Sequence, residues 1–239
     1  MKFYMVVLAL DTTTRRGSAA LMRDGRLVGT FSGDALITHG QRLPGDLLRL
    51  LATHGVGIGE VDLFGVASGP GSFTGLRIGI ASLQGFALAN GRPLVGVSAL
   101  DALNDVARSS LDSAAPPLAD EEAVVAAWLD AQRGQVFSAV YTGHRVIEGP
   151  IVDTPDKLLA GLETSPSLFI GDGALTYERM ISERHPGAQI AREVPPLAPG
   201  VARLAELYVR EHGPQPPDAI RPIYVRRSDA ELARDRATS

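Results

Sequence analysis

The stretch SGPGSFTGLRIG, residues 68–79, lies between two apolar runs of different length. The run before it, VDLFGVAS, has the length of a buried strand. The run after it stays apolar to about Asn90, and Gly91-Arg92-Pro93 then predicts the end of a helix. Strand, loop and helix in this order recur in the first part of the chain and predict an α/β domain.

The loop matches none of the common glycine loops of enzymes. It has no Lys for a Walker loop, and Pro70 lacks the N–H that a phosphate cradle uses. A nucleophile elbow requires G-x-S-x-G, whereas Gly71 directly precedes Ser72. Ser72 as a nucleophile in another geometry stays open, but Ser72 or Thr74 at a helix start predicts a cap, and an anion bound with help from Arg77 is a further alternative. The signature loop comprises Gly69, Pro70, Gly71, Ser72, Thr74, Gly75 and Arg77.

Composition excludes several classes of site. The 239 residues include no cysteine, so disulfides, thiolate metal sites and a cysteine nucleophile are impossible. The five histidines stand at positions 39, 54, 144, 185 and 212, too far apart for a helical metal-binding pair. The net charge is −4, and no Lys/Arg block for nucleic acid precedes the C-terminal end. The first apolar run, MVVLAL, is too short for a signal peptide or membrane span, so a cytoplasmic protein is expected.

The chain divides into two predicted units, 1–108 and 109–239. The first opens with a buried strand ending at Asp11 and a hairpin around Asp24-Gly25. Residues 109–121 are small, acidic and Pro-containing, which is typical of a linker. The second unit repeats the order of strand, polar turn and helix less regularly. Its last helix, at about 200–212, is expected to pack back on the first unit.

Two helices of the first unit are predicted to form a subunit interface. The helix after the signature loop is apolar on nearly all sides, and one sheet cannot bury both it and the leucine-rich helix at 39–54. The alternative is that the chain itself covers both helices. Under the interface prediction, Gly79→Arg should abolish association and leave the chain folded. The expected contact residues are Leu43, Leu47, Leu50, Leu51, Gly75, Gly79, Ser82 and Phe86.

Six stretches together resemble one family. They are LALDTTTRRGSAALM, GVASGPGSFTGLRIGIASLQGFA, LVGVSALDALNDVA, AAWLDAQRGQVFSAVY, IGDGA and IRPIYVRR, and they cover most of the chain. This sequence resembles the TsaB (YeaZ) family of accessory proteins in bacterial tRNA threonylcarbamoyladenosine biosynthesis. The resemblance implies the fold of the ASKHA superfamily of sugar kinases, Hsp70 and actin, with two ribonuclease-H-like α/β units of mixed sheets flanked by helices.

The resemblance also implies a function and partners. TsaB is a non-catalytic paralogue of TsaD, the enzyme that transfers the threonylcarbamoyl group to an adenosine beside the anticodon of tRNA. A heterodimer with TsaD through the two N-terminal helices of each protein is implied, with the P-loop ATPase TsaE joining and a homodimer when the chain is alone. No cofactor is expected on this chain, although the assembled complex uses ATP. The chain is expected to contact tRNA only indirectly, through the complex.

The catalytic elements of the relatives look degenerate here. The metal-binding H-x-x-x-H of TsaD falls on Ala99 and Leu103, which implies no metal. The segment Asp11-Thr12-Thr13 resembles the first phosphate turn of the superfamily, so nucleotide binding stays a weak alternative. The turn at 130–134 has bulky Gln and Arg side chains where phosphate needs close backbone approach.

Two alternative functions and one alternative contact stay open. A peptidase that cleaves its partner would need Ser72 as nucleophile, and an active ASKHA kinase would need Asp11. The C-terminal arginines are expected to be ordinary surface charges, with a tRNA contact as the alternative. They are Arg221, Arg226 and Arg227.

Overall fold

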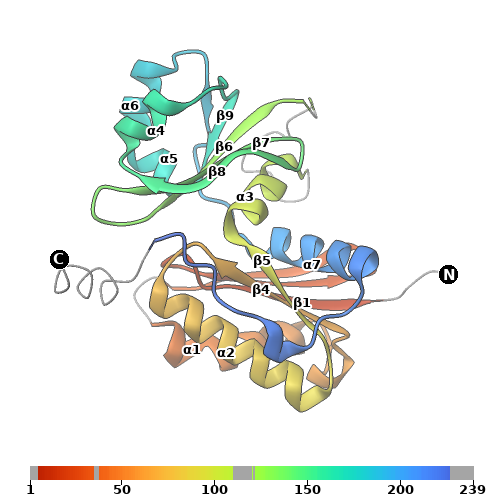
Figure 1. The fold of residues 1–239 in the computed structure, drawn as a ribbon. Helices are drawn as coiled ribbons and strands as arrows, with labels where there is room; N and C mark the ends of the chain where they lie inside the picture. Colours follow the sequence, from red (N-terminus) through yellow and green to blue (C-terminus); the bar gives the residue numbers. More distant parts are fainter. Residues whose placement is uncertain (1–4, 35–37, 110–119, 121, 227–239) are drawn as a thin grey trace, which may run out of the picture.

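The fold consists of two α/β units, each built on a five-stranded mixed sheet (Figure 1). The computed structural model describes residues 5–34, 38–109, 120 and 122–226. Arg227 therefore lies outside the described residues. Within the described part of the chain, no helix is both long and apolar enough to cross a membrane.

The sheet of the first unit has the spatial order β3-β2-β1-β4-β5. Strands β1, β2 and β3 form an antiparallel meander, and β4 and β5 continue parallel to β1. The predicted turn at Asp24 and Gly25 joins β2 to β3, with both residues at positive φ. The strands are β1 (Val6–Asp11), β2 (Ser18–Arg23), β3 (Arg26–Ser32), β4 (Leu63–Gly69) and β5 (Leu94–Ser98).

The sheet of the second unit repeats this topology in the order β8-β7-β6-β9-β10. Its first three strands also form an antiparallel meander, and β9 and β10 also run parallel to the first strand. The repeated topology confirms the fold class expected from the resemblance. The strands are β6 (Val124–Asp130), β7 (Val136–Thr142), β8 (Arg145–Asp153), β9 (Leu168–Ile170) and β10 (Gln189–Ile190).

Helices cover both faces of the first sheet, which is why its central strand is apolar throughout. Leu8 and Leu10 of β1 join the core under helices α1 (His39–Thr53) and α2 (Phe73–Asn90). Val7 and Ala9 join the core under α7 (Ala198–His212) on the other face, next to α3 (Ala99–Arg108). Helix α3 also packs against β6, so it lies between the two units (Figure 1). The remaining helices are α4 (Pro155–Gly161), α5 (Asp172–Thr176), α6 (Glu178–Arg184) and the 3-10 turns η1 (Ile58–Glu60) and η3 (Pro217–Ala219).

After α7 the chain returns across the first unit as residues 213–226, which we call the C-terminal strap. The Gln215 carbonyl accepts from the Leu94 N–H, and Gln84 of α2 donates to the Pro217 carbonyl over 2.9 Å. The Ile223 N–H then donates to the Ser68 carbonyl at the end of β4 over 2.6 Å. The strap thus runs from α7 to the opening between the two units (Figure 1).

Helix α2 lies directly on the turn that follows β1. The Thr12 hydroxyl donates to the Gly75 carbonyl over 2.8 Å, and Thr12 is fully buried. A Cβ on Gly75 would overlap the Thr12 carbonyl oxygen, and a Cβ on Gly79 would overlap the Thr12 hydroxyl. These two glycines are therefore required for contact within the chain. The expectation that Gly79→Arg leaves the chain folded is corrected, because Thr12 occupies the space.

Two alanine substitutions test this contact. Gly79→Ala should lower the free energy of unfolding by about 1–3 kcal/mol, because the added methyl group overpacks a closed site. Gly85→Ala is the matched control on the same helix: it faces open space and should gain up to about 1 kcal/mol from helix propensity. Urea unfolding measures both. Equal effects of the two substitutions would contradict the packing described for Thr12.

Candidate functional site

The candidate site is a cleft of about 990 Å³ between the two units. Strands β1, β4 and β6 and the short strand β9 all end beside it, so each unit contributes the polar turns that follow its strands. The C-terminal strap closes part of the opening with Ile223, Tyr224, Val225 and Arg226. The cleft therefore combines the turn after Asp11, the signature loop, the turn at 130–134 and Asp172.

The first turn is organised by the carboxylate of Asp11. Its Oδ1 accepts from the Thr13 N–H over 2.7 Å and from the Thr13 hydroxyl over 2.5 Å, and its Oδ2 accepts from the Thr14 hydroxyl over 3.3 Å. Burial raises the pKa of Asp11; the bonds from Thr13 and Thr14 oppose this, and the charge of Asp172 adds to it. Both carboxylate oxygens thus hold the turn itself.

The turn of the second unit is organised in the same way. Asp130 accepts from the Gln132 backbone N–H over 2.8 Å and from its side-chain amide over 2.7 Å. Gln132 and Arg133 are left-handed, with φ of 60° and 58°, as this tight turn requires. Asp172 accepts from the Asp130 N–H over 2.8 Å, and burial, with the Asp130 charge, raises the pKa of Asp172. The bulky Gln132 side chain thus bonds Asp130 of its own turn.

The signature loop packs against the first turn. The Ser72 N–H donates to the Thr13 carbonyl over 2.9 Å, and a Cβ on Gly71 would overlap Thr13. A side chain at Gly69, which has a φ of 123°, would overlap the Ile223 carbonyl of the strap. The loop therefore joins the first turn, α2 and the strap, and Pro70, buried within it, lines the cleft.

The Ser72 hydroxyl is the cap of α2, as the sequence predicts. It accepts from the Gly75 N–H over 3.2 Å, and Ser72 and Thr74 are both exposed and line the cleft. His39 also lines the cleft, with its Nε2 3.1 Å from the Thr14 carbonyl. The described residues contain no group of three or more His, Cys, Asp or Glu side chains placed to hold a metal.

The resemblance places the metal histidines of TsaD at two positions that lie in the core between the units. Ala99 and Leu103 of α3 are fully buried. A Cβ at Gly171, before Asp172, would approach the Leu103 side chain. Leu103 thus fills the space beside the second unit with an apolar side chain.

The expected interface residues fall into two groups. Leu43, Leu47, Leu50 and Leu51 belong to the core under α1 and α2, with Gly75 and Gly79 against Thr12, so these six are covered by the chain itself. This corrects their expected place on the surface, because the sheet and the first turn fill the space they face. Ser82 and Phe86 are half-buried.

The exposed side of α1 and α2 carries other small and apolar residues. Leu48 is 46 % exposed and Leu88 is 61 % exposed, and a Cβ at Gly45 or Gly85 would meet no atom. We call this surface the outer face. It consists of Gly45, Leu48, Ala81, Gly85 and Leu88.

Sequence reasoning missed the role of the strap. Tyr224 stacks on Phe73 with ring centroids 5.1 Å apart, and Arg226 donates to the Gln135 side chain of the second unit over 2.6 Å. The signal was present as the apolar and aromatic residues of IRPIYVRR near the C-terminus. Arg221 of the same segment donates to the Ile220 carbonyl over 3.0 Å.

Comparison with known proteins gives consistent matches along the chain. The family model described as "TsaD: tRNA N6-adenosine threonylcarbamoyltransferase" matches residues 31–232. A Haemophilus influenzae protein named tRNA threonylcarbamoyladenosine biosynthesis protein TsaB is 29 % identical over 93 % of this chain and 94 % of its own length. The matches thus extend across both units.

Solved structures agree with these matches. YeaZ from Pseudomonas aeruginosa is 29 % identical with a TM-score of 0.73, covering 92 % of this chain and 99 % of its own. A second structure, described as similar to peptidase YeaZ from Pseudomonas aeruginosa, is 27 % identical with a TM-score of 0.74 over 93 % and 100 %. A Listeria monocytogenes protein described as a putative N-acetylmannosamine kinase shares the fold alone, at 9 % identity and a TM-score of 0.51 over 87 % and 99 %.

The raised pKa of Asp11 predicts a pH dependence of stability. A raised pKa means that the stability associated with this group is complete below its ordinary pKa of 3.8 and is lost as the pH rises through the raised value. Asp11→Asn cannot ionise, so its free energy of unfolding should rise relative to wild type over the range upward from the ordinary pKa of 3.8. Urea midpoints across this range measure the difference.

The control is Asp153→Asn, at an exposed carboxylate whose pKa is lowered chiefly by the Thr154 N–H. Its pH-dependent difference should have the opposite sign and lie below about pH 4, because a lowered pKa contributes stability above the ordinary value. Parallel curves for wild type and Asp11→Asn would contradict the burial of an ionisable Asp11.

Proposed function

The chain belongs to the TsaB (YeaZ) family, and we propose that it is a non-catalytic subunit that makes a TsaD transferase competent to modify tRNA. The relatives are named for tRNA threonylcarbamoyladenosine biosynthesis. In this role the chain supplies a surface and a fixed shape to its partner. The threonylcarbamoyl transfer itself takes place on TsaD.

The observation that carries the proposal is that the polar side chains of the cleft form hydrogen bonds with the backbone of their own turns. Asp11 and Asp130 each bond their own turn, and Ser72 caps α2. Ala99 and Leu103, where the resemblance places the metal histidines of TsaD, are apolar and fully buried. The three polar side chains, which could serve as catalytic groups in an enzyme, therefore stabilise the structure of the cleft in this chain.

The outer face is the proposed contact with the transferase. Exposed Leu48 and Leu88 flank the open positions Gly45 and Gly85, where a partner helix can approach closely. Burying such apolar area is the main driving force of most associations. The same face accounts for a homodimer when the chain is alone, and TsaE and its ATP join after the heterodimer has formed.

A peptidase is the second candidate function, because one similar structure is described as peptidase-like. It would use Ser72, whose hydroxyl already accepts from Gly75. Reconstitution with the other purified pathway proteins separates the two functions. Threonylcarbamoyladenosine should form on tRNA only when this chain is present, and Asp11→Ala and Ser72→Ala chains that stay folded should support formation equally. Product formation without the chain would contradict the proposal, and loss of activity with Ser72→Ala in an assembled complex would favour the peptidase.

The outer face itself is tested by charge insertion. Gly85→Arg should weaken binding to the transferase by at least about tenfold while leaving the unfolding midpoint near wild type, because the new side chain enters open space on the face. Gly187→Arg is the matched control, since a Cβ there also meets no atom but lies in the second unit. Calorimetric titration measures both. Unchanged binding by Gly85→Arg would remove the outer face from the proposal.

A further inference from the structure

An aromatic and arginine cluster stands at the opening of the cleft, outside the outer face. The Phe73 and Tyr224 rings stack with centroids 5.1 Å apart at 30°. The Arg77 guanidinium lies 4.0 Å from the centre of the Phe73 ring, and its Nε donates to the Tyr224 hydroxyl over 3.3 Å. We call these three side chains the stacking platform.

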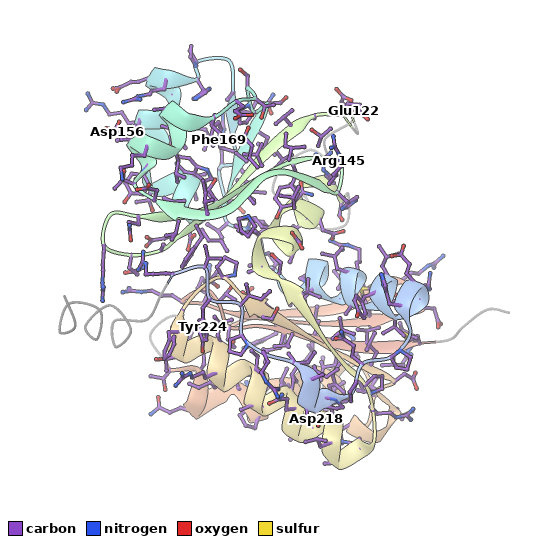
Figure 2. All side chains as sticks on the ribbon, in the orientation of Figure 1. Glu122, Arg145, Asp156, Phe169, Asp218 and Tyr224 are labelled. Carbon is purple, nitrogen blue, oxygen red and sulfur yellow. The ribbon has the colours of Figure 1, made fainter. Side chains whose placement is uncertain are left out.

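The platform is exposed although it is fixed in place. Phe73 is 42 % exposed and Tyr224 is 46 % exposed. Tyr224 is held because the neighbouring Ile223 N–H bonds the Ser68 carbonyl over 2.6 Å, and Figure 2 shows Tyr224 at the opening between the units. Stacked aromatic rings that the fold holds at the surface offer a flat apolar face without a further cost in ordering.

The surroundings of the platform are rich in positive charge, although the whole chain is acidic. Arg15, Arg133 and Arg226 line the same cleft, and Arg77 belongs to the platform. Arg226 donates to the Gln135 amide oxygen and lies 5.7 Å from the Phe137 ring. The described acidic side chains that line this cleft are Asp130, which accepts from the Gln132 N–H, and Asp172, which accepts from the Asp130 N–H. Among the described residues, the cleft is thus lined by three arginines and two aspartates, and Arg77 stands at its opening.

We propose that the platform binds an unpaired base of the tRNA substrate, with the arginines around the cleft contacting the adjoining phosphates. Unpaired loop bases are recognised by stacking on aromatic rings and arginine planes, and phosphates by arginine. The charge around the platform is complementary to RNA, whereas the neutral outer face suits a protein. This inference rests on the proposed function for the identity of the RNA. It proposes that the chain contacts tRNA directly, whereas the resemblance implied only an indirect contact.

Fluorescence anisotropy with a labelled anticodon stem–loop RNA tests the platform on the full chain. Tyr224→Ala should weaken binding about tenfold, which is the loss expected for one base stack. Tyr224→Phe keeps the ring and should bind like wild type, and Val146→Ala, at an exposed apolar side chain on β8 of the second unit, should also be unchanged. Thermal unfolding confirms that each variant is folded. A fully paired RNA of the same charge should bind more weakly than the stem–loop and show no loss with Tyr224→Ala.

Arg15 provides an independent variant on another element. Arg15→Ala should weaken binding of every RNA alike and reduce the slope of log affinity against log salt by about one. Equal stem–loop affinity for wild type and Tyr224→Ala would overturn the proposal. Loss of transferase binding by Tyr224→Ala without loss of RNA affinity would also overturn it, and would assign the platform to a protein contact.

The experiments distinguish failure of the proposed function from failure of RNA binding by the stacking platform. If omission of the chain leaves threonylcarbamoyladenosine formation unchanged, the proposed function fails even where Tyr224→Ala weakens RNA binding. If the chain is required but Tyr224→Ala raises neither the dissociation constant for stem–loop RNA nor the KM for tRNA, the platform fails and the proposed function stands.

Discussion

The contact between Thr12 and helix α2 is the constraint on which the rest of the site depends. Thr12 follows the central strand of the first sheet, and its hydroxyl bonds the Gly75 carbonyl where only glycine leaves room. This contact sets the position of the helix, and with it the signature loop that begins the helix. The outer face and the stacking platform each include residues of α2, so both depend on where this contact places the helix.

In both units an aspartate at the end of the first strand stabilises the turn that follows it. Each begins with a meander whose first strand ends in an aspartate, and each aspartate bonds the backbone of the turn after it. Asp172 adds to the second turn by accepting from the Asp130 N–H, so these carboxylates of the cleft hold the backbone. Under the proposed function the fold is a rigid support, and its contacts with other molecules are made by the outer face and the stacking platform.

Local patterns predicted much of this structure. The strand ending at Asp11, the hairpin at Asp24, the Ser72 cap and the helix end at Gly91 each depend on a few neighbouring residues, and all are confirmed. The side of a helix that faces the core depends on distant segments. The sequence pattern predicted a subunit interface at Gly75 and Gly79, but the sequence does not show that Thr12, rather than another chain, contacts them. The strap was missed for the same reason, since Tyr224 meets Arg77 across 147 residues.

The most direct test of the account is hydrogen exchange of the chain with and without its transferase, read by mass spectrometry. If the chain acts through a surface and not through its cleft, peptides carrying the outer face around Leu48 and Gly85 should become protected. Peptides carrying the turns at 11–15 and 130–134 should exchange at the same rate in both states, with or without ATP. Protection confined to those two turns, with the outer face unchanged, would contradict the account. It would indicate that the chain acts through its cleft.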